Sequence, residues 1–523
     1  MTNFTDKSYR KKLFLHLDGI ALLPVFNFLL NKKIIHYLKE NDATLDQITE
    51  KFKTNKGYTN ICLRTLWSAG LLTCNNDKKI FSFRNARKSF QAEAIISFKR
   101  ELNDFINILT YYKDFNNIIN MKNPSVYYNN LITCNTHLDS IKMEIGGRGP
   151  NLKNLAICEY FEGLLIGPII AHLGFLNIIS ARGIHFERLN ALEKIITNIF
   201  REHKYIDYLN NFTEKGNFFF KRSASYGVTV SYIKTFVRLE DLLINNNYFI
   251  WERDVNGNEF HVNRAMNVWG SGGAHKFYFK KIDEIIINIF NKKIEHQPKG
   301  IIDIGCGDGT FLEHVYDLAI NHSIRKNHIK EYPLKLIGVD INKAARDASR
   351  ERLEKRNIDH LIIKGNISDP DSINRKLMKK FKLNLKDLLN SRTFLDHNRI
   401  YSDPKTENKL LKQSTGGFCF KGNYISSDQL GNNLIEHLSL WKPYINKHGI
   451  IILELHTIHP DDSNKYRGKN LSCAYDTTHG FSDQYLVEYD FYIYCCKKAG
   501  LKLKDNFLFP NEKIPTVSVG YFK

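Results

Sequence analysis

The feature that most constrains this chain is an apolar run that breaks into a glycine-rich turn, followed by a second apolar run that ends in a carboxylate. The first run and its turn span residues 301–312, with Gly305, Gly307 and Gly309 in the turn, and the second run ends at Asp340. Glycines let the backbone pass close to a ligand, and an acid at the tip of the next strand can accept hydrogen bonds from both ribose hydroxyls. The order strand, turn, helix, strand, acid predicts a nucleoside-binding site. A glycine turn without a ligand, with Asp340 as an ordinary cap at the strand end, is the alternative.

The spacing of the glycines separates two classes of cofactor. A dinucleotide site requires Gly-x-Gly-x-x-Gly at a helix N-terminus, whereas here Asp308 stands where a carboxylate would repel phosphate. The turn resembles that of the class I S-adenosylmethionine-dependent methyltransferases, whose cofactor carries a sulfonium, an amino-acid tail and no phosphate. The resemblance implies that Asp303 and the turn with Gly305, Gly307 and Gly309 line the methionine moiety, and that Asp340 holds the ribose.

From residue 301 onward, the pattern alternates between strands and helices. Five strands are predicted near residues 300–304, 334–339, 360–364, 391–396 and 449–455, with two closing strands at 501–509 and 516–522. This order implies an α/β fold with the Rossmann-like, doubly wound sheet of class I methyltransferases and a late antiparallel strand. Binding loops are then expected at the C-terminal ends of the parallel strands.

A length of 523 residues indicates two or three domains. Residues 1–75 contain helical segments, one of them opened by a capping box of Thr44 and Gln47. They resemble the winged-helix region that precedes the catalytic domain in many small-molecule methyltransferases. Helical spacing of apolar residues predicts a helical lid over residues 76–250. The methyltransferase domain is predicted over residues 251–523.

The composition indicates the state of the cysteines, the location of the protein and the kind of partner to expect. Nine cysteines without a Cys-x-x-Cys pair favour reduced thiols over a disulfide framework or a zinc site. The apolar stretch of residues 20–30 is interrupted by Pro24 and Asn27, so we expect a soluble, cytoplasmic protein without a membrane partner. The net charge of +20 could signal nucleic acid, but no compact basic tract carries interleaved aromatics, so nucleic acid is not the expected partner.

Two further segments are expected beside the cofactor. Ser271 and Gly272 lie in a glycine-rich segment, residues 267–275, that could fold over the cofactor; a flexible linker between lid and catalytic domain is the alternative. Asn366 and Ile367 follow the third strand, where class I methyltransferases read the adenine. For these two residues a plain surface loop is the alternative.

Candidate catalytic residues follow the fourth and fifth strands. Asp396 and His397 stand at the predicted tip of the fourth strand, and His456 ends the fifth. Histidine and aspartate are acid/base and metal-ligand types, which makes these three the catalytic candidates. A structural hydrogen-bonding role is the alternative for each histidine.

A narrower resemblance appears in three short runs, at residues 270–272, 394–399 and 482–484. Together they resemble the methyltransferase domains of apratoxin-type polyketide loading modules. The resemblance implies C-methylation of a malonyl-type acyl group, free or bound to a carrier protein, assisted by a mononuclear iron. His397 and Gln484 would be the metal ligands, with His456 a third polar contact. A divalent metal chelated by two carbonyl oxygens would lower the cost of forming the enolate.

Two other functions stay open at this stage. A small-molecule O-methyltransferase could use His397 or His456 as a general base on a hydroxyl, and it would not depend on a metal. A winged-helix protein that binds or modifies nucleic acid would show binding that falls steeply with salt.

Overall fold

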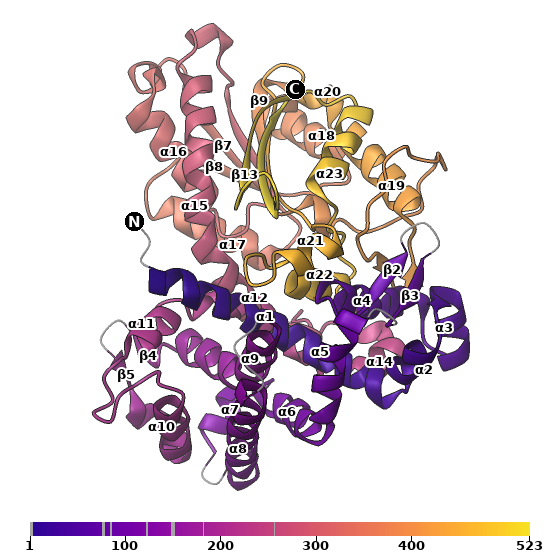
Figure 1. Cartoon of the computed structure of the whole chain (residues 1–523). Coiled ribbons are helices and arrows are strands. Elements are labelled where there is room, and N and C mark those ends of the chain that lie inside the picture. The colour runs from indigo at the N-terminus through magenta and orange to yellow at the C-terminus, as the bar shows by residue number, and fades with distance from the viewer. Residues whose placement is uncertain are drawn as a thin grey trace. The chain divides into compact units, whose positions relative to one another are not determined.

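The structure is a computed structural model that describes residues 4–75, 79–83, 86–113, 115–121, 124–147, 152–180, 183–255 and 257–523. Its contacts divide the chain into two compact units, both visible in Figure 1. The first comprises Met1–Gly273, Gly417–Tyr424 and His459–Asp483, and the second comprises Ala274–Gly416, Ile425–Ile458 and Gln484–Lys523.

The first unit is mostly helical. Its helices are α1 (Phe4–Asn31), α2 (Ile34–Glu40), α3 (Leu45–Phe52), α4 (Lys56–Ser68), α5 (Ala86–Ser97), α6 (Lys99–Tyr112), α7 (Phe115–Ile119), α8 (Ser125–Gly147), α9 (Leu152–Phe175), α10 (Glu193–Glu202), α11 (Glu214–Phe220), α12 (Ala224–Ser231), α13 (Ile233–Phe236), α14 (Leu239–Leu243), α21 (Pro460–Lys465) and α22 (Ser472–Gly480). Short strand pairs and a small sheet complete it: β1 (Ala43–Thr44), β2 (Thr73–Asn75), β3 (Ile80–Ser82), β4 (Ile179–Ser180), β5 (Gly183–Ile184), β10 (Cys419–Phe420) and β11 (Asn423–Tyr424).

Helices α1 and α9 pack together in the core of this unit. A Cβ at Gly19 would meet backbone atoms of Tyr160 at 2.4 Å, and one at Gly163 would meet the Cα of His16 at 2.3 Å, so glycine is required where the two backbones approach. Both helices are long and apolar enough to cross a membrane, but 94% and 89% of their apolar windows are buried inside the protein. Their composition is that of core helices, which are apolar all round.

The described part of residues 1–75, predicted to be winged-helix-like, forms helices and part of a small sheet, and the winged-helix assignment stays a prediction. Helices α2, α3 and α4 accompany a three-stranded sheet of order β1-β3-β2. The predicted capping box begins α3: the Gln47 N–H donates to Thr44 Oγ1 (3.3 Å) and the Thr44 N–H donates to Gln47 Oε1 (2.8 Å). Gly70, with φ of +67°, follows the end of α4.

The second unit is built on a seven-stranded sheet of order β13-β14-β12-β9-β6-β7-β8. Its strands are β6 (Gly300–Ile304), β7 (Lys335–Asp340), β8 (His360–Lys364), β9 (Leu388–Thr393), β12 (Ile450–Leu455), β13 (Leu503–Phe509) and β14 (Val517–Phe522). Strand β14 is antiparallel to both of its neighbours, and the pairs from β12 to β8 are parallel. The predicted doubly wound α/β fold is confirmed.

Helices cover both faces of this sheet (Figure 1). They are the C-terminal part of α15 (Arg264–Phe290), α16 (Thr310–His322), α17 (Lys343–Glu354), α18 (Pro370–Phe381), α19 (Ser427–Ser439), α20 (Lys442–Ile445) and α23 (Tyr489–Lys498). All five residues of β6 are buried, as expected for a central parallel strand whose two faces are both covered.

The fourth strand of the sheet ends earlier than its sequence suggests. The apolar pattern predicts a strand over residues 391–396, whereas β9 ends at Thr393. Phe394 has φ of +54°, a left-handed conformation that cannot continue a strand, and a 3-10 turn follows over Asp396–Asn398. The candidate catalytic residues therefore stand on a tight turn beyond the strand.

Candidate active site

The glycine turn after β6 adopts the conformation that its sequence predicts. Gly305, Gly307 and Gly309 have φ values of +77°, +53° and +80°, and Gly309 directly precedes α16. Residues with a Cβ rarely adopt such angles. The N–H groups of Gly305 and Cys306 donate to the carbonyl of Val339 in β7 (2.7 and 3.1 Å), which holds the turn at the C-terminal edge of the sheet.

Asp340 joins the end of β7 to this turn. Its Oδ2 accepts a hydrogen bond from the Gly307 N–H (3.2 Å) and its Oδ1 accepts one from the Asn342 N–H (2.8 Å). A carboxylate can accept about four hydrogen bonds, so each oxygen retains the capacity to accept one from a ribose hydroxyl. The structure thus brings the predicted ribose acid and the predicted glycine turn together.

Asp303 lies beneath the turn, within β6. Its side chain is buried, and Oδ1 accepts a hydrogen bond from the Ser391 hydroxyl of β9 (3.0 Å). Burial raises the pKa of Asp303 to about 8, so the carboxyl group is largely protonated at neutral pH. Its contact with the methionine moiety stays a prediction.

The loop after β8 is anchored by its neighbours. Asn366 is exposed and its side-chain oxygen accepts from the Ser368 N–H (3.0 Å), while the carbonyl of the buried Ile367 accepts from the Trp441 indole N–H (3.0 Å). These bonds fix the loop at the expected edge of the sheet. No described contact tests the adenine role of either residue.

The segment of residues 267–275 is helical, and the sequence does not reveal this. Ser271 and Gly272 lie within α15, and the Ser271 hydroxyl donates to the Val268 carbonyl (3.2 Å). A Cβ at Gly270 would meet the backbone N of Val228 at 2.6 Å, so this glycine allows α15 to pack closely against α12. The predicted contact of Ser271 and Gly272 with a cofactor stays a prediction.

Asp396 is the centre of a buried ion pair. Its carboxylate accepts hydrogen bonds from Arg392 Nη2 (3.0 Å), the Tyr492 hydroxyl (2.6 Å) and His437 Nε2 (3.2 Å). Burial alone would favour the neutral acid, but Arg392 and then His437 and Tyr492 hold the pKa of Asp396 well below its usual range. Such a carboxylate is suited to holding the turn in place, and its predicted catalytic role gains no support from this geometry.

His397 is oriented by Glu454, which lies at the end of β12. The ring Nδ1 and Glu454 Oε1 are 2.5 Å apart, and both side chains are buried. Glu454 also accepts hydrogen bonds from the backbone N–H groups of Asp396 (2.7 Å), His397 (3.3 Å) and Leu455 (2.7 Å). Because the Nδ1–H group donates its hydrogen bond to the Glu454 carboxylate, any proton transfer or metal ligation by this ring would use Nε2.

His456 has both of its ring nitrogens engaged. Nδ1 lies 3.3 Å from the Val487 carbonyl and Nε2 lies 2.7 Å from the Ser518 hydroxyl of β14. Burial lowers the pKa of His456 to about 4, so the ring is neutral at physiological pH. These contacts describe a structural hydrogen-bonder better than a general base or a third polar contact of a metal.

Gln484 is brought next to His397 by the backbone. The N–H of the following residue, Tyr485, donates to the His397 carbonyl (2.8 Å), so the two predicted metal-binding segments lie side by side. The side chain of Gln484 is largely buried. Whether the two residues hold a metal stays a prediction.

A second group of possible metal ligands lies in the first unit. His16, Glu159 and Glu162 have ligand atoms within 4.8 Å of one another. However, Lys12 pairs with Glu159, and both Lys142 and Lys215 pair with Glu162, each at 2.6 Å. Three ammonium groups already neutralise the two carboxylates, so this group is an ion-pair network that a metal cation would have to displace.

Several residues of the site escape sequence reasoning. Glu454 lies two residues before His456, in a strand that reads as an ordinary apolar run, and Arg392, His437 and Tyr492 come from three separate elements. A charged residue inside an otherwise apolar strand, as at Glu454, is the one signal that could have found one of them, since buried charges require partners.

Three family profiles match the chain. The AprA MT2-like methyltransferase domain matches residues 259–520, the AprA N-terminal domain matches residues 9–74, and the AprA winged helix domain matches residues 162–246. The winged-helix match lies outside residues 1–75, for which the sequence predicts a winged-helix-like region. The limits of 1–75, 76–250 and 251–523 stay predictions.

Solved structures with a similar chain path include three methyltransferases. An O-methyltransferase family 2 protein from Planctomyces limnophilus, in complex with apigenin, is 11% identical, with 99% of this chain and 95% of that chain covered and a TM-score of 0.36. The O-methyltransferase NcsB1 from neocarzinostatin biosynthesis, with S-adenosylmethionine and a naphthoic acid, is 11% identical (68% and 95% covered, TM-score 0.34). The DszA carbon methyltransferase is also 11% identical (67% and 82% covered, TM-score 0.33). These TM-scores are too low to bear on substrate or mechanism. A comparison with curated proteins finds no match.

Proposed function

Since the chain belongs to the AprA MT2-like family of S-adenosylmethionine-dependent methyltransferases, we propose that it methylates carbon in a malonyl-type or other β-carbonyl acyl substrate, free or bound to a carrier protein. Such a reaction belongs to polyketide-like biosynthesis. The observation that carries the proposal is that His397, on the turn after β9, pairs with Glu454 of β12. This pair lies at the same edge of the sheet as the glycine turn.

The glycine turn and Asp340 fit S-adenosylmethionine. Three left-handed glycines leave the backbone without side chains at the end of β6, and the Asp340 carboxylate is fixed by two backbone N–H groups. An uncharged ribose and an amino-acid tail suit this site better than a pyrophosphate would, because Asp308 lies in the same turn. Bound there, the cofactor supplies an electrophilic methyl group.

We assign to His397 the removal of the proton from the acceptor carbon. Removing a proton between two carbonyl groups gives the enolate that attacks a methyl group. Glu454 holds the Nδ1 proton of His397, which leaves Nε2 as the basic position of the ring. The three backbone N–H groups that donate to Glu454 hold this carboxylate in place.

The side chains at this place also carry donor atoms that suit a divalent metal. When a metal is bound, His397 Nε2 and the amide oxygen of Gln484 would hold it, so His397 would act as a ligand instead of a base. The metal would then polarise the substrate carbonyls as a Lewis acid and thereby lower the pKa of the acceptor C–H. Two neutral ligands leave the metal its full charge and open positions for substrate, but they are fewer than the three protein ligands usual for catalytic zinc. We therefore expect weak metal binding without substrate.

The experiment that tests this function is mass spectrometry of malonyl thioesters incubated with the protein and S-adenosylmethionine, with iron added or chelator present. The expected product gains one methyl mass per turnover, with the methyl on carbon as shown by the ¹³C shift of a labelled methyl group. His397→Ala is expected to abolish it. Transfer to oxygen that is insensitive to chelator would instead establish the O-methyltransferase alternative and contradict the proposal.

A further inference from the structure

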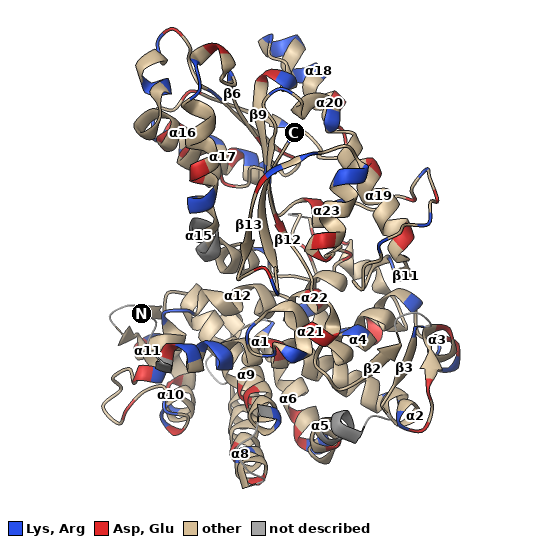
Figure 2. Ribbon diagram, turned by 45° about the horizontal axis from the view of Figure 1, so that its top comes forward, with Lys and Arg blue, Asp and Glu red and all other residues tan. Residues whose placement is uncertain are grey.

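Basic side chains surround a hollow at the end of the sheet opposite the candidate active site. The hollow has a volume of about 540 Å³, and its basic lining residues are Lys292, Lys293, His296, Lys447, His448 and Lys523. They precede β6 and β12 or follow β14, whereas Asp340 and His397 follow the other ends of their strands. Figure 2 shows further basic segments on α18 and α20 at this end.

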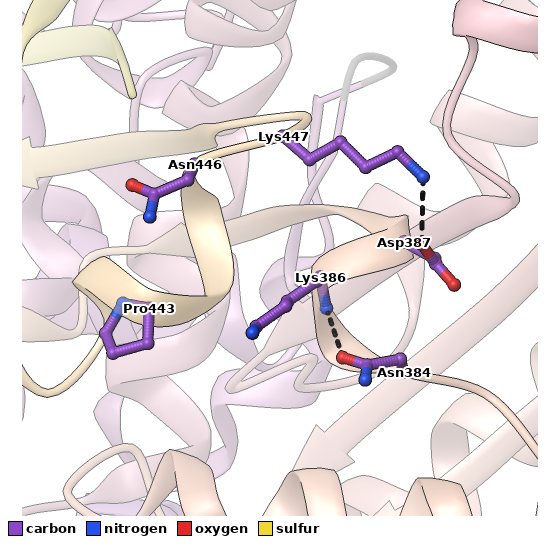
Figure 3. Close-up of a pocket in the computed structure, with 6 residues that line it drawn as sticks. All are labelled: Asn384, Lys386, Asp387, Pro443, Asn446 and Lys447. Carbon is purple, nitrogen blue, oxygen red and sulfur yellow. Dashed lines mark hydrogen bonds and ion pairs between the residues drawn. The ribbon is translucent and has the colours of Figure 1, made fainter.

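A smaller adjoining hollow shows where one of these charges is neutralised. It has a volume of about 290 Å³, shares Lys447 with the larger hollow and is drawn in Figure 3. Asp387 there pairs with Lys447 and with Lys299, each at 3.0 Å. The acid nearest to Lys447 is therefore already shared between two ammonium groups.

The other lysines of the larger hollow lack such partners. Lys292, Lys293 and Lys523 form no ion pair among the residues that the structure describes, and Glu295 is the one acid among the lining residues. Burial, Lys292 and Lys504 lower the pKa of Lys523. Burial and the nearby lysines, led by Lys447, lower the pKa of His448 to about 4. Burial is the larger cause of both pKa shifts, and the neighbouring lysines add to it, so a bound anion would offset part of each shift.

The remaining lining suits an organic group. Tyr521 is largely buried and its hydroxyl donates to the His448 carbonyl (2.8 Å), which fixes the ring at the wall of the hollow beside Ile289. A volume of this size lies within the roughly 300–1,000 Å³ typical of small-molecule sites. Lysine binds phosphate well as a point charge.

We propose that this hollow binds a small organic polyphosphate, a molecule with at least two adjoining phosphate groups attached to a ring that packs on Tyr521. The basic residues that line this hollow enclose the volume of a small molecule, so we argue for a small anion rather than for a nucleic acid or an acidic protein. The proposal does not depend on which acyl group the protein methylates.

Isothermal titration calorimetry with ADP, inorganic pyrophosphate and adenosine tests the proposal in 150 mM salt. The expected result is one ADP site per chain, weaker binding of pyrophosphate and no binding of adenosine. Lys292→Ala combined with Lys523→Ala should weaken ADP binding at least tenfold. Lys379→Ala combined with Lys380→Ala removes two exposed lysines of α18 from the same unit and should leave it unchanged.

Four outcomes would overturn the proposal. If ADP does not bind at this salt concentration, the hollow is not a polyphosphate site. If adenosine binds as tightly as ADP, the lysines do not contribute to binding. An equal loss in both double variants would show attraction to net charge alone. A short RNA duplex that binds where ADP does not, and is lost in the first variant, would assign the surface to nucleic acid. Circular dichroism of both variants checks that the fold is intact.

Discussion

Glu454→Gln tests the site most informatively, because one buried carboxylate there accepts four hydrogen bonds. Oε1 accepts from His397 Nδ1 and the Leu455 N–H, and Oε2 accepts from the N–H groups of Asp396 and His397. Glutamine has the same shape but offers one oxygen and one NH₂ group. In either orientation, two buried donors lose their acceptor.

The expected magnitude follows from that count. An unsatisfied buried donor costs about 1–3 kcal/mol, so the variant should lose about 2–6 kcal/mol of unfolding free energy in the second unit. If the His397 ring responds by moving its proton to Nε2, it can no longer accept a proton there. Turnover should then fall by about 10²-fold or more, the usual contribution of a positioned general base.

Urea denaturation, hydrogen exchange of the peptide over residues 395–400 and steady-state methyl transfer measure these effects. Glu354→Gln, at the exposed end of α17, is the matched control and should change none of them. Binding of S-adenosylmethionine should stay the same in both variants, because Glu454 lies on a different strand from the glycine turn. A Glu454→Gln variant with unchanged unfolding free energy and turnover would refute the reasoning.

Four further substitutions probe neighbouring groups. Burial raises the pKa of Asp303 to about 8, so the native state holds a proton that the unfolded chain releases near pH 4. Thermal stability should therefore fall as the pH rises from about 4 to about 8, and Asp303→Asn should make this fall smaller. Asp396→Asn leaves Arg392 buried without its counter-charge and should lower the free energy of unfolding by about 3–5 kcal/mol, measured by denaturation. A change within about ±0.5 kcal/mol, the range usual for surface substitutions, would show that the ion pair is dispensable. His397→Ala and Gln484→Ala should each abolish iron binding measured by titration with a malonyl thioester present, and retention of metal binding and turnover by both would place the metal elsewhere.

Much of the sheet could be predicted because the residues that determine its strands and turns are neighbours in the sequence. Buried parallel strands read as apolar runs, and left-handed turns require glycine, so β6, β7 and the turn between Gly305 and Gly309 are evident from the sequence. Asp340 follows from its place at the end of the second run. These features need no knowledge of distant parts of the chain.

The rest of the site depends on contacts between segments far apart in sequence. The role of Glu454 becomes visible only when β12 is placed beside the turn after β9, because its partners lie 57 and 58 residues away. Gly270 reads as part of a loop because its helical packing partner, Gly227, lies in another helix. Residues 417–424 and 459–483 likewise belong to the first unit, although the chain order suggests one continuous C-terminal domain.

The central claim is that S-adenosylmethionine binds at the glycine turn with its ribose held by Asp340, and calorimetric titration of the cofactor tests it most directly. One site per chain is expected in the unaltered protein, with affinity at least tenfold weaker in Asp340→Ala and unchanged in the control Glu354→Gln. No heat of binding in the unaltered protein, or equal affinity in Asp340→Ala, would contradict it.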